Sequence, residues 1–238
     1  MAEPELELGD RGRKERIGVE PLGVSNVTKS VQPARRPVAL MLRFIGSLPQ
    51  SAQAQGVYAV AYTELFALIT WTSVGLMGAA SAVAGQNLGA GKPDRAVRGV
   101  RVAAGIGLGA AAVIGALFLL IPTLLLNVFG MTEPDVVALG RQLLAFLAVS
   151  GLFVTVALSY TGGLQGTGDT KGPLYVSIAS QVLVPIGICT AIQMTRGLHP
   201  SDIWLAIVIG HFTRCMLSIW RFQLGKWRNI AVEIPSTS

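Results

Sequence analysis

The sequence contains few charged residues and few aromatic residues. Only 13% of its 238 residues are charged and 51% are hydrophobic, whereas about a quarter of the residues in a soluble domain are charged. Because a soluble fold has to cover its surface with polar groups, this composition excludes an ordinary water-soluble globule. An aromatic content of 7% together with 28 glycines is typical of membrane helices, in which small residues allow close packing.

Cysteine and histidine are too rare and too scattered for a metal or haem site. Cys189 and Cys215 both lie in apolar runs, which favours small core residues over a disulfide. His199 and His211 have no further ligand at a metal-binding spacing. No nucleophile–base pair is evident, so a membrane enzyme is the least favoured class, and we expect no metal and no cofactor. The net charge of +6 does not indicate nucleic-acid binding, because no basic stripe is interleaved with aromatic residues.

Five apolar segments are long enough to cross a bilayer, which needs about 20 residues. They lie near residues 57–84, 100–122, 137–160, 173–194 and 203–223. Since a helix satisfies its own backbone hydrogen bonds, these runs form helices in lipid. The sequence therefore predicts an all-α fold, a polytopic membrane helix bundle over 57–224 with about five complete transmembrane helices and a cytoplasmic tail at 225–238. Pro185 should kink the fourth helix.

The distribution of Lys and Arg predicts the orientation. If the loop after the first span is cytoplasmic, that side carries Lys92, Arg95, Arg98, Arg101, Lys171, Arg221, Lys226 and Arg228, and the opposite side carries Arg141 and Arg196. Basic residues favour the cytoplasmic side, so we expect a multi-pass protein of the plasma (inner) membrane with a cytoplasmic C-terminus. Trp220 and Trp227 are then expected to be interface anchors.

The N-terminal region differs from the rest of the chain. Residues 1–37 are charged and aperiodic, which predicts a disordered or non-native segment. With five spans and a cytoplasmic C-terminus, the basic residues of this N-terminal region would lie outside, which conflicts with the preference of Lys and Arg for the cytoplasmic side. The conflict disappears if a further helix precedes the first span. We therefore interpret residues 38–56 as the remnant of a helix and an outer loop, and the chain as a truncated part of a larger transporter.

Two glycine-rich stretches follow the first and third spans: AGQNLGAGKPDRA at 84–96 and TGGLQGTGDTKGP at 161–173. The first is not a Walker A loop, because five residues separate Gly85 and Gly91, and Pro93 stands where Ser or Thr should bind magnesium. Both stretches predict tight cytoplasmic turns in which glycine supplies positive φ and helix caps. The motif residues are Gly85, Gln86, Gly89, Gly91, Gly163, Gly166, Gly168 and Asp169.

In the second span, the pairs Gly105/Gly109 and Gly107/Ala111 predict a face for close helix packing.

A few polar residues lie inside the apolar segments. Glu64 is a candidate coupling residue, because an ionised carboxylate is costly in a membrane and is therefore often functional. The alternative is that it reaches interfacial water near the outer end of its span. Further candidates for coupling or substrate contact are Tyr62, Thr63, Tyr160 and Gln181. Arg214, near His211, either snorkels or pairs within the bundle, or lies on a transport pathway.

The stretches VAGQNLGAGKPDRA (83–96) and GGLQGTGDTKGP (162–173) resemble two hallmark stretches of the multidrug and toxic compound extrusion (MATE) family. By this resemblance, residues 57–223 correspond to helices eight to twelve of a twelve-helix fold, and the chain to one lobe of a two-lobe transporter. The resemblance implies an antiporter that exports organic, often cationic compounds in exchange for sodium ions or protons. The family's cation sites often use an acid in helix one, or acids in helices seven and ten. By the resemblance, helix one and most of helix seven have no counterpart in this sequence, and the helix-ten equivalent has no acid.

The resemblance also implies partners. Besides the lipid bilayer and organic small-molecule substrates, we expect a missing N-terminal lobe or a homodimer, and the chain by itself should be inactive, because alternating access needs two units. Two alternatives remain open: a membrane assembly or interaction subunit without transport, and a lipid-carrier flippase of related architecture, which would need a more cationic cavity.

Overall fold

The computed structural model describes residues 43–48 and 51–229. The chain divides into two units, residues 1–36 and 37–238, and all described residues belong to the second. The segment 1–37, for which disorder is predicted, lies outside the described residues, as do 38–42, 49–50 and 230–238.

Five helices in the described part are long and apolar enough to cross a membrane. The first is continuous over Ser51–Gly89 and comprises α2 (Ser51–Tyr58), η1 (Ala59–Leu65) and α3 (Ala67–Gly89). The others are α4 (Pro93–Leu120), α6 (Pro134–Gly166), the combination of α7 (Lys171–Ile178), η2 (Ala179–Leu183) and α8 (Val184–Thr195), and α9 (Pro200–Gln223). Two short helices, α5 (Pro122–Val128) and η3 (Lys226–Asn229), complete the fold, and no strand occurs among the described residues. The predicted all-α helix bundle is confirmed.

The helices extend beyond the apolar runs from which they were predicted. The first begins at Ser51, so residues 51–56 are helical instead of part of an outer loop, and residues 43–46 also form a helical turn. α4 begins at Pro93, seven residues before the predicted 100, because Pro93 occupies the first helical turn and Asp94 follows it there. Proline and acidic residues stabilise this position of a helix, although they break the apolar pattern.

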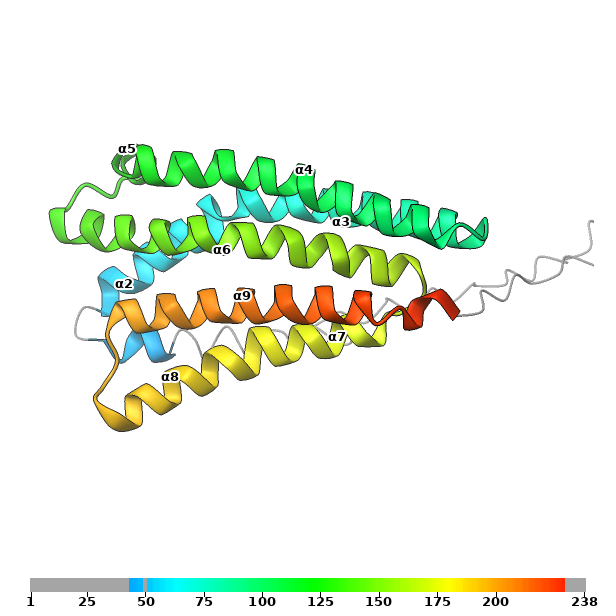
Figure 1. Cartoon of the computed structure of the whole chain (residues 1–238). Helices are drawn as coiled ribbons and strands as arrows, with labels where there is room; N and C mark the ends of the chain where they lie inside the picture. The colour runs from blue at the N-terminus through cyan, green and yellow to red at the C-terminus, as the bar shows by residue number, and fades with distance from the viewer. Residues whose placement is uncertain (1–42, 49–50, 230–238) are drawn as a thin grey trace, which may run out of the picture. The chain divides into compact units, whose positions relative to one another are not determined.

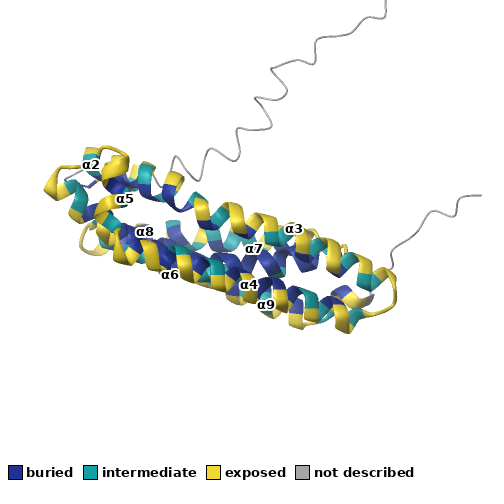
Figure 2. Cartoon of the chain, turned by 90° about the horizontal axis from the view of Figure 1, so that it is seen from above, coloured by how far each residue is buried: buried dark blue, intermediate teal, exposed yellow. Residues whose placement is uncertain are grey.

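α6 lies at the centre of the bundle. It packs against α3, α4 and α9, whereas α8 packs against α9 (Figure 1). In its most apolar 18-residue window, 61% of the residues are buried, against at most 44% in the other four long helices. Figure 2 shows buried residues on the inward faces of the helices and exposed residues along the outer faces. A helix that is apolar all round and also largely buried is the expected core of such a bundle.

Glycines bring the backbones of α3 and α6 into direct contact. A Cβ atom at Gly162 would lie 2.1 Å from the carbonyl oxygen of Met77, and one at Gly166 would lie 2.0 Å from that of Ser81. The small-residue face predicted on the second span is only half correct. Gly107 packs against Thr155 of α6, but Gly105 and Gly109 have no neighbouring atom within 4 Å.

Two segments of the membrane-length helices are π-helical, η1 in the first and η2 in the fourth. In the first, the backbone N–H of Phe66 donates to the carbonyl of Ala61 at 2.9 Å, five residues earlier. η2 ends two residues before Pro185, so the irregularity expected from this proline takes the form of a widened turn. Such π-helical turns occur frequently at functional sites.

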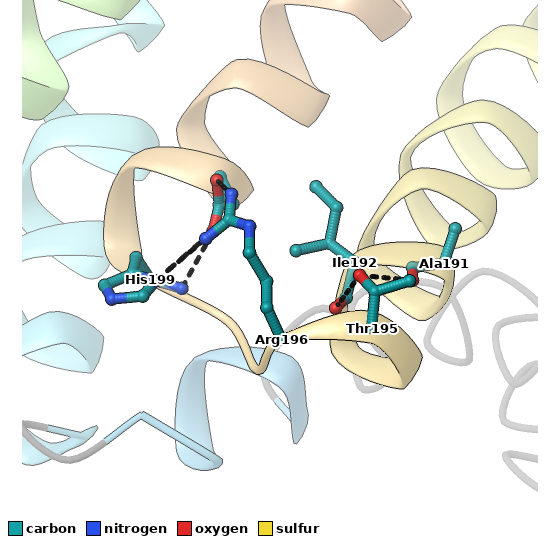
Figure 3. A network of polar contacts seen from close by, with 6 residues as sticks. Ala191, Ile192, Thr195, Arg196 and His199 are labelled. Carbon is teal, nitrogen blue, oxygen red and sulfur yellow. Dashed lines mark hydrogen bonds and ion pairs between the residues drawn. The ribbon is translucent and has the colours of Figure 1, made fainter.

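Specific polar contacts tie the ends of α9 to the bundle. At its start, Asp202 accepts hydrogen bonds from the backbone N–H of His199 (3.0 Å) and from Arg196 Nη2 (2.7 Å). Figure 3 shows Arg196 reaching from the end of α8 toward His199 across this turn. At the other end, Trp227 in η3 is 1% exposed and donates from Nε1 to the carbonyl of Phe222 at 2.8 Å. Because Trp227 is buried, the expectation that it is an interface anchor is wrong. Trp220 is 59% exposed, so its side chain is accessible for the anchoring role expected of it.

Candidate functional site

A cavity of about 500 Å³ opens between the first long helix, α6, η2 and α9. Its polar lining residues are Tyr62, Thr63, Thr70, Gln181, His211 and Arg214. Three of the predicted candidates, Tyr62, Thr63 and Gln181, are therefore brought together here although 118 positions separate Thr63 from Gln181.

Both π-helical turns deliver residues to this cavity. Tyr62 and Thr63 lie in η1, and Gln181 lies in η2. The Thr63 hydroxyl donates to the carbonyl of Ala59 within the same turn. A π-helical turn changes the angle at which the following side chains leave the helix, so a regular 3.6-residue helical wheel does not predict which residues face the cavity.

Stacked rings form one wall of the cavity. The ring centroids of Tyr58 and Tyr62 are 4.9 Å apart, those of Tyr62 and Phe66 5.6 Å, and those of Phe66 and His211 5.8 Å. Trp71 also lines the cavity and is 76% exposed. A wall of flat rings with one large exposed indole provides a surface for the apolar part of an organic ligand.

Three polar nitrogen atoms at this cavity are buried and lack a hydrogen-bond partner in the described part of the chain. They are Nε2 of Gln181, Nδ1 of His211 and Nε of Arg214. None of the four ion pairs found among the described residues involves Arg214, so the expected pairing within the bundle does not occur there. Buried polar groups are nearly always hydrogen-bonded, and such a gathering of unpaired ones indicates a place for a ligand.

A second cavity, also of about 500 Å³, adjoins the first and shares Leu158 and Arg214 with it. Its polar lining residues are Thr161, Gln165, Thr170, Lys171 and Ser177. Arg214 thus lies between the two cavities, and no acidic side chain of the described chain lines either of them. The combined lining is mainly apolar, and its charged residues, Arg214 and Lys171, are both positive.

Glu64 and Tyr160 lie away from this cavity. Glu64 is exposed on η1 and does not line the cavity, although the adjacent Thr63 does. Tyr160 packs edge-on against Phe222 with ring centroids 5.3 Å apart, and lines a separate cavity of about 410 Å³ near the end of α9. Of the five predicted candidates, Glu64 and Tyr160 therefore lie apart from the three that line the cavity.

Sequence reasoning missed Thr70 and Trp71 as cavity residues and did not connect His211 with the first span. Thr70 and Trp71 follow Tyr62 and Thr63 by eight residues, which is slightly more than two helical turns. Because this spacing runs through the π-helical turn η1, a regular helical wheel could not have identified them. No group of three or more His, Cys, Asp or Glu residues suited to a metal ion occurs in the described ranges.

The two glycine-rich motifs lie next to each other at one end of the bundle. A Cβ atom at Gly85 in the first motif would lie 2.7 Å from the carbonyl oxygen of Gly166 in the second. Only Gly91 (φ 68°) and Gly168 (φ 91°) have the positive φ predicted for these turns. Gly85, Gly163 and Gly166 are helical, so their expected role in a turn is wrong. Gln86 and Gly89 are exposed near the end of α3.

Asp169 in the second motif joins its loop to α9. It accepts hydrogen bonds from Arg221 and from the backbone N–H of Gly172. Burial alone would raise the pKa of Asp169, but these hydrogen bonds and the charge of Arg221 outweigh it and hold the pKa below its usual value. Asp169 is therefore a structural anchor of this loop and does not line the cavities described above.

Comparisons with known proteins agree with this architecture. The chain is 29% identical over 176 residues to the multidrug resistance protein PmpM of Pseudomonas aeruginosa, covering 70% of this chain and 35% of PmpM. It is 27% identical over 168 residues to a probable multidrug resistance protein NorM of Rhodopseudomonas palustris, covering 67% and 34%. It is also 29% identical over 154 residues to the multidrug and toxin extrusion protein 1 of Oryctolagus cuniculus, covering 65% and 27%.

A solved structure shares the fold. The crystal structure of the eukaryotic MATE transporter AtDTX14 superimposes with a TM-score of 0.66 at 23% identity, covering 87% of this chain and 49% of that one. The chain thus spans about a third of the length of the curated relatives and about half of the solved transporter. The MatE family model matches residues 38–190, which is more than half of the sequence, and the chain belongs to the MatE family of membrane transporters.

Proposed function

We propose that this chain forms one lobe of a secondary-active antiporter that exports organic compounds in exchange for sodium ions or protons. The observation that carries the proposal is the pair of adjoining, mainly apolar cavities, whose lining includes buried nitrogen atoms that have no partner in the described chain. The printed names of the relatives, which are multidrug resistance and toxin extrusion proteins, support export of organic compounds.

The second wall of the transport pathway comes from another lobe, which is either an N-terminal half or a second copy of this lobe. Alternating access in such transporters requires two units that move against each other around a central site. A chain that covers 35% of PmpM and 49% of AtDTX14 provides one such unit. Alone, this chain exports nothing.

The proposed orientation places the C-terminus in the cytoplasm. Arg221 pairs with Asp169, and Arg228 pairs with Asp94 at 3.3 Å, so the end of α9 lies beside the α6–α7 loop and the start of α4. Basic residues therefore gather at this end of the bundle, whereas the turn between α8 and α9, which contains Arg196, lies at the other end (Figure 1). The excess of Lys and Arg marks the cytoplasmic end.

A related flippase activity toward a lipid carrier is the second candidate. The observation that favours it is the positive charge of Arg214 and Lys171 at the cavities, where the described chain supplies no acid. A lipid carrier with a phosphate headgroup would bind such a lining.

Transport measurements test the proposal. We expect cells that express the chain together with an N-terminal lobe to accumulate less of a fluorescent organic compound than control cells, and cells that express the chain alone to match the controls. Efflux should disappear when a protonophore and a sodium ionophore remove the ion gradients. Efflux by the chain as a proven monomer would contradict the requirement for two lobes. Absence of efflux from every two-lobe form, over both cationic and anionic probes, would contradict antiport.

A further inference from the structure

Arg214 lies in the middle of an apolar membrane helix and faces two cavities without a counter-ion in the described chain. An uncompensated charge in a low-dielectric environment is destabilising unless a partner neutralises it. The guanidinium group presents its donors in a planar fork that matches a carboxylate, sulfonate or phosphate group. The vacant donors of Arg214 therefore specify an anionic partner.

The side chains next to Arg214, those of Gln181 and His211, also favour an anionic partner. Gln181 contributes a buried Nε2, which is a hydrogen-bond donor, from η2. His211, one turn before Arg214 on α9, is 4% exposed and its buried Nδ1 also has no partner among the described residues. That nitrogen donates in one of the two tautomers of the neutral ring. Three side chains on two elements, η2 and α9, thus offer donors at the same cavity, and its described lining contains no carboxylate.

The remainder of the lining suits an aromatic body. Trp71 is 76% exposed and lines the same cavity as Tyr62, which is stacked between Tyr58 and Phe66. An exposed indole binds another flat ring by offset stacking, and the edge of Tyr62, whose faces are covered by its two neighbours, can contact that ring in an edge-to-face arrangement. The cavity of about 500 Å³ falls within the range of ordinary small-molecule sites.

We propose that Arg214, Gln181 and His211 form a binding site for the anionic group of an aromatic amphipathic compound, whose rings lie against Trp71 and Tyr62. This inference rests on the proposed transport function for its biological role, but binding itself can be measured in the chain alone. It differs from the organic cations that the family resemblance implies, because the wall contributed by this chain is positively charged.

Calorimetric titration of the purified full chain in a non-ionic detergent tests the site. The two probes share one ring system and differ in charge: naphthalene-2-sulfonate and a naphthyl trimethylammonium ion. We expect the sulfonate to bind at least about tenfold more tightly than the cation, as one charge-assisted hydrogen bond alone accounts for about that factor. Equal or tighter binding of the cation would overturn the proposal.

Substitutions locate the interaction. Arg214→Gln should weaken sulfonate binding about tenfold or more, whereas Arg101→Gln, which removes the same charge from an exposed position outside the cavity, should change it by less than about twofold. If Arg214→Gln does not fold, Gln181→Leu should still weaken binding about threefold and leave the charge in place. Equal loss in the Arg101 variant would reveal non-specific attraction and would overturn the site, as would unchanged binding in the variants of the cavity.

The outcomes separate this inference from the proposed function. Tight sulfonate binding without export from any two-lobe form would contradict antiport and leave the anion site standing. Export of cations, with no sulfonate binding to the chain, would support antiport and remove the anion site.

Discussion

Arg221 holds Asp169 through two parallel hydrogen bonds, from Nε to Oδ2 at 2.7 Å and from Nη2 to Oδ1 at 2.9 Å. Gly172 allows this approach, because a Cβ atom at its position would lie 1.7 Å from Nε of Arg221. The contact joins the second glycine-rich loop to the end of α9, which is 52 residues away in the sequence. A bidentate pair between a loop and a helix fixes both distance and orientation.

Removing either partner of this contact should destabilise the bundle. We expect Asp169→Asn and Arg221→Gln each to lower the free energy of unfolding by roughly 1–3 kcal/mol, since each leaves a charged group without its partner. Thermal unfolding in detergent measures the effect, and the double variant should cost less than the sum of the single ones. Additive losses would show that the two side chains do not stabilise the fold through each other.

The contribution of Asp169 should depend on pH in one direction. Because its folded-state pKa lies below the usual value of about 4, its stabilisation is fully present above that value and is lost as the pH falls through the folded-state pKa. The difference in melting temperature between the native chain and Asp169→Asn should therefore be constant from neutral pH down to about 5 and shrink below about 4. A difference that grows on acidification would disprove this assignment.

The close contact of α3 and α6 should not tolerate a methyl group. Gly162→Ala places a Cβ atom 2.1 Å from the carbonyl oxygen of Met77, so the two backbones must separate and the fold should lose roughly 1–3 kcal/mol. Gly105→Ala is the matched control, since this helical glycine has nothing within 4 Å. There the higher helix propensity of alanine should leave stability unchanged or raise it by up to about 1 kcal/mol. The measurement is the melting temperature of both variants, and equal effects would contradict the contact.

The role of Glu64 as a coupling residue remains a prediction. It lies on the π-helical turn beside the cavity-lining Thr63, where a carboxylate exposed on this lobe can meet a second lobe. We expect Glu64→Gln to abolish ion-coupled export in a two-lobe form, whereas Glu133→Gln, which removes an exposed acid at the start of α6, should have little effect. Export at the native rate by the Glu64 variant would contradict a coupling role and would favour the alternative that Glu64 reaches interfacial water.

The positions of the individual cavity residues could be predicted only in part. Tyr62, Thr63 and Gln181 were found because polar side chains in apolar segments are conspicuous, and all three line the cavity. Tyr160 was found by the same criterion, but the rotation of α6 directs it toward Phe222. Polarity indicates that a residue is unusual in a membrane, but which face of the helix it occupies depends on packing.

The sequence by itself determined that this chain is a bundle of membrane helices, because five apolar runs have no other way to satisfy their backbone in lipid. It also predicted a positive-φ turn in each glycine-rich stretch, because such a conformation is local, but not that Gly91 and Gly168 are the glycines that adopt it. Only the tertiary structure decided that Arg214 faces two cavities and that Asp169 anchors Arg221. Those relationships join residues of different helices, and the two π-helical turns shift the register by which such residues meet.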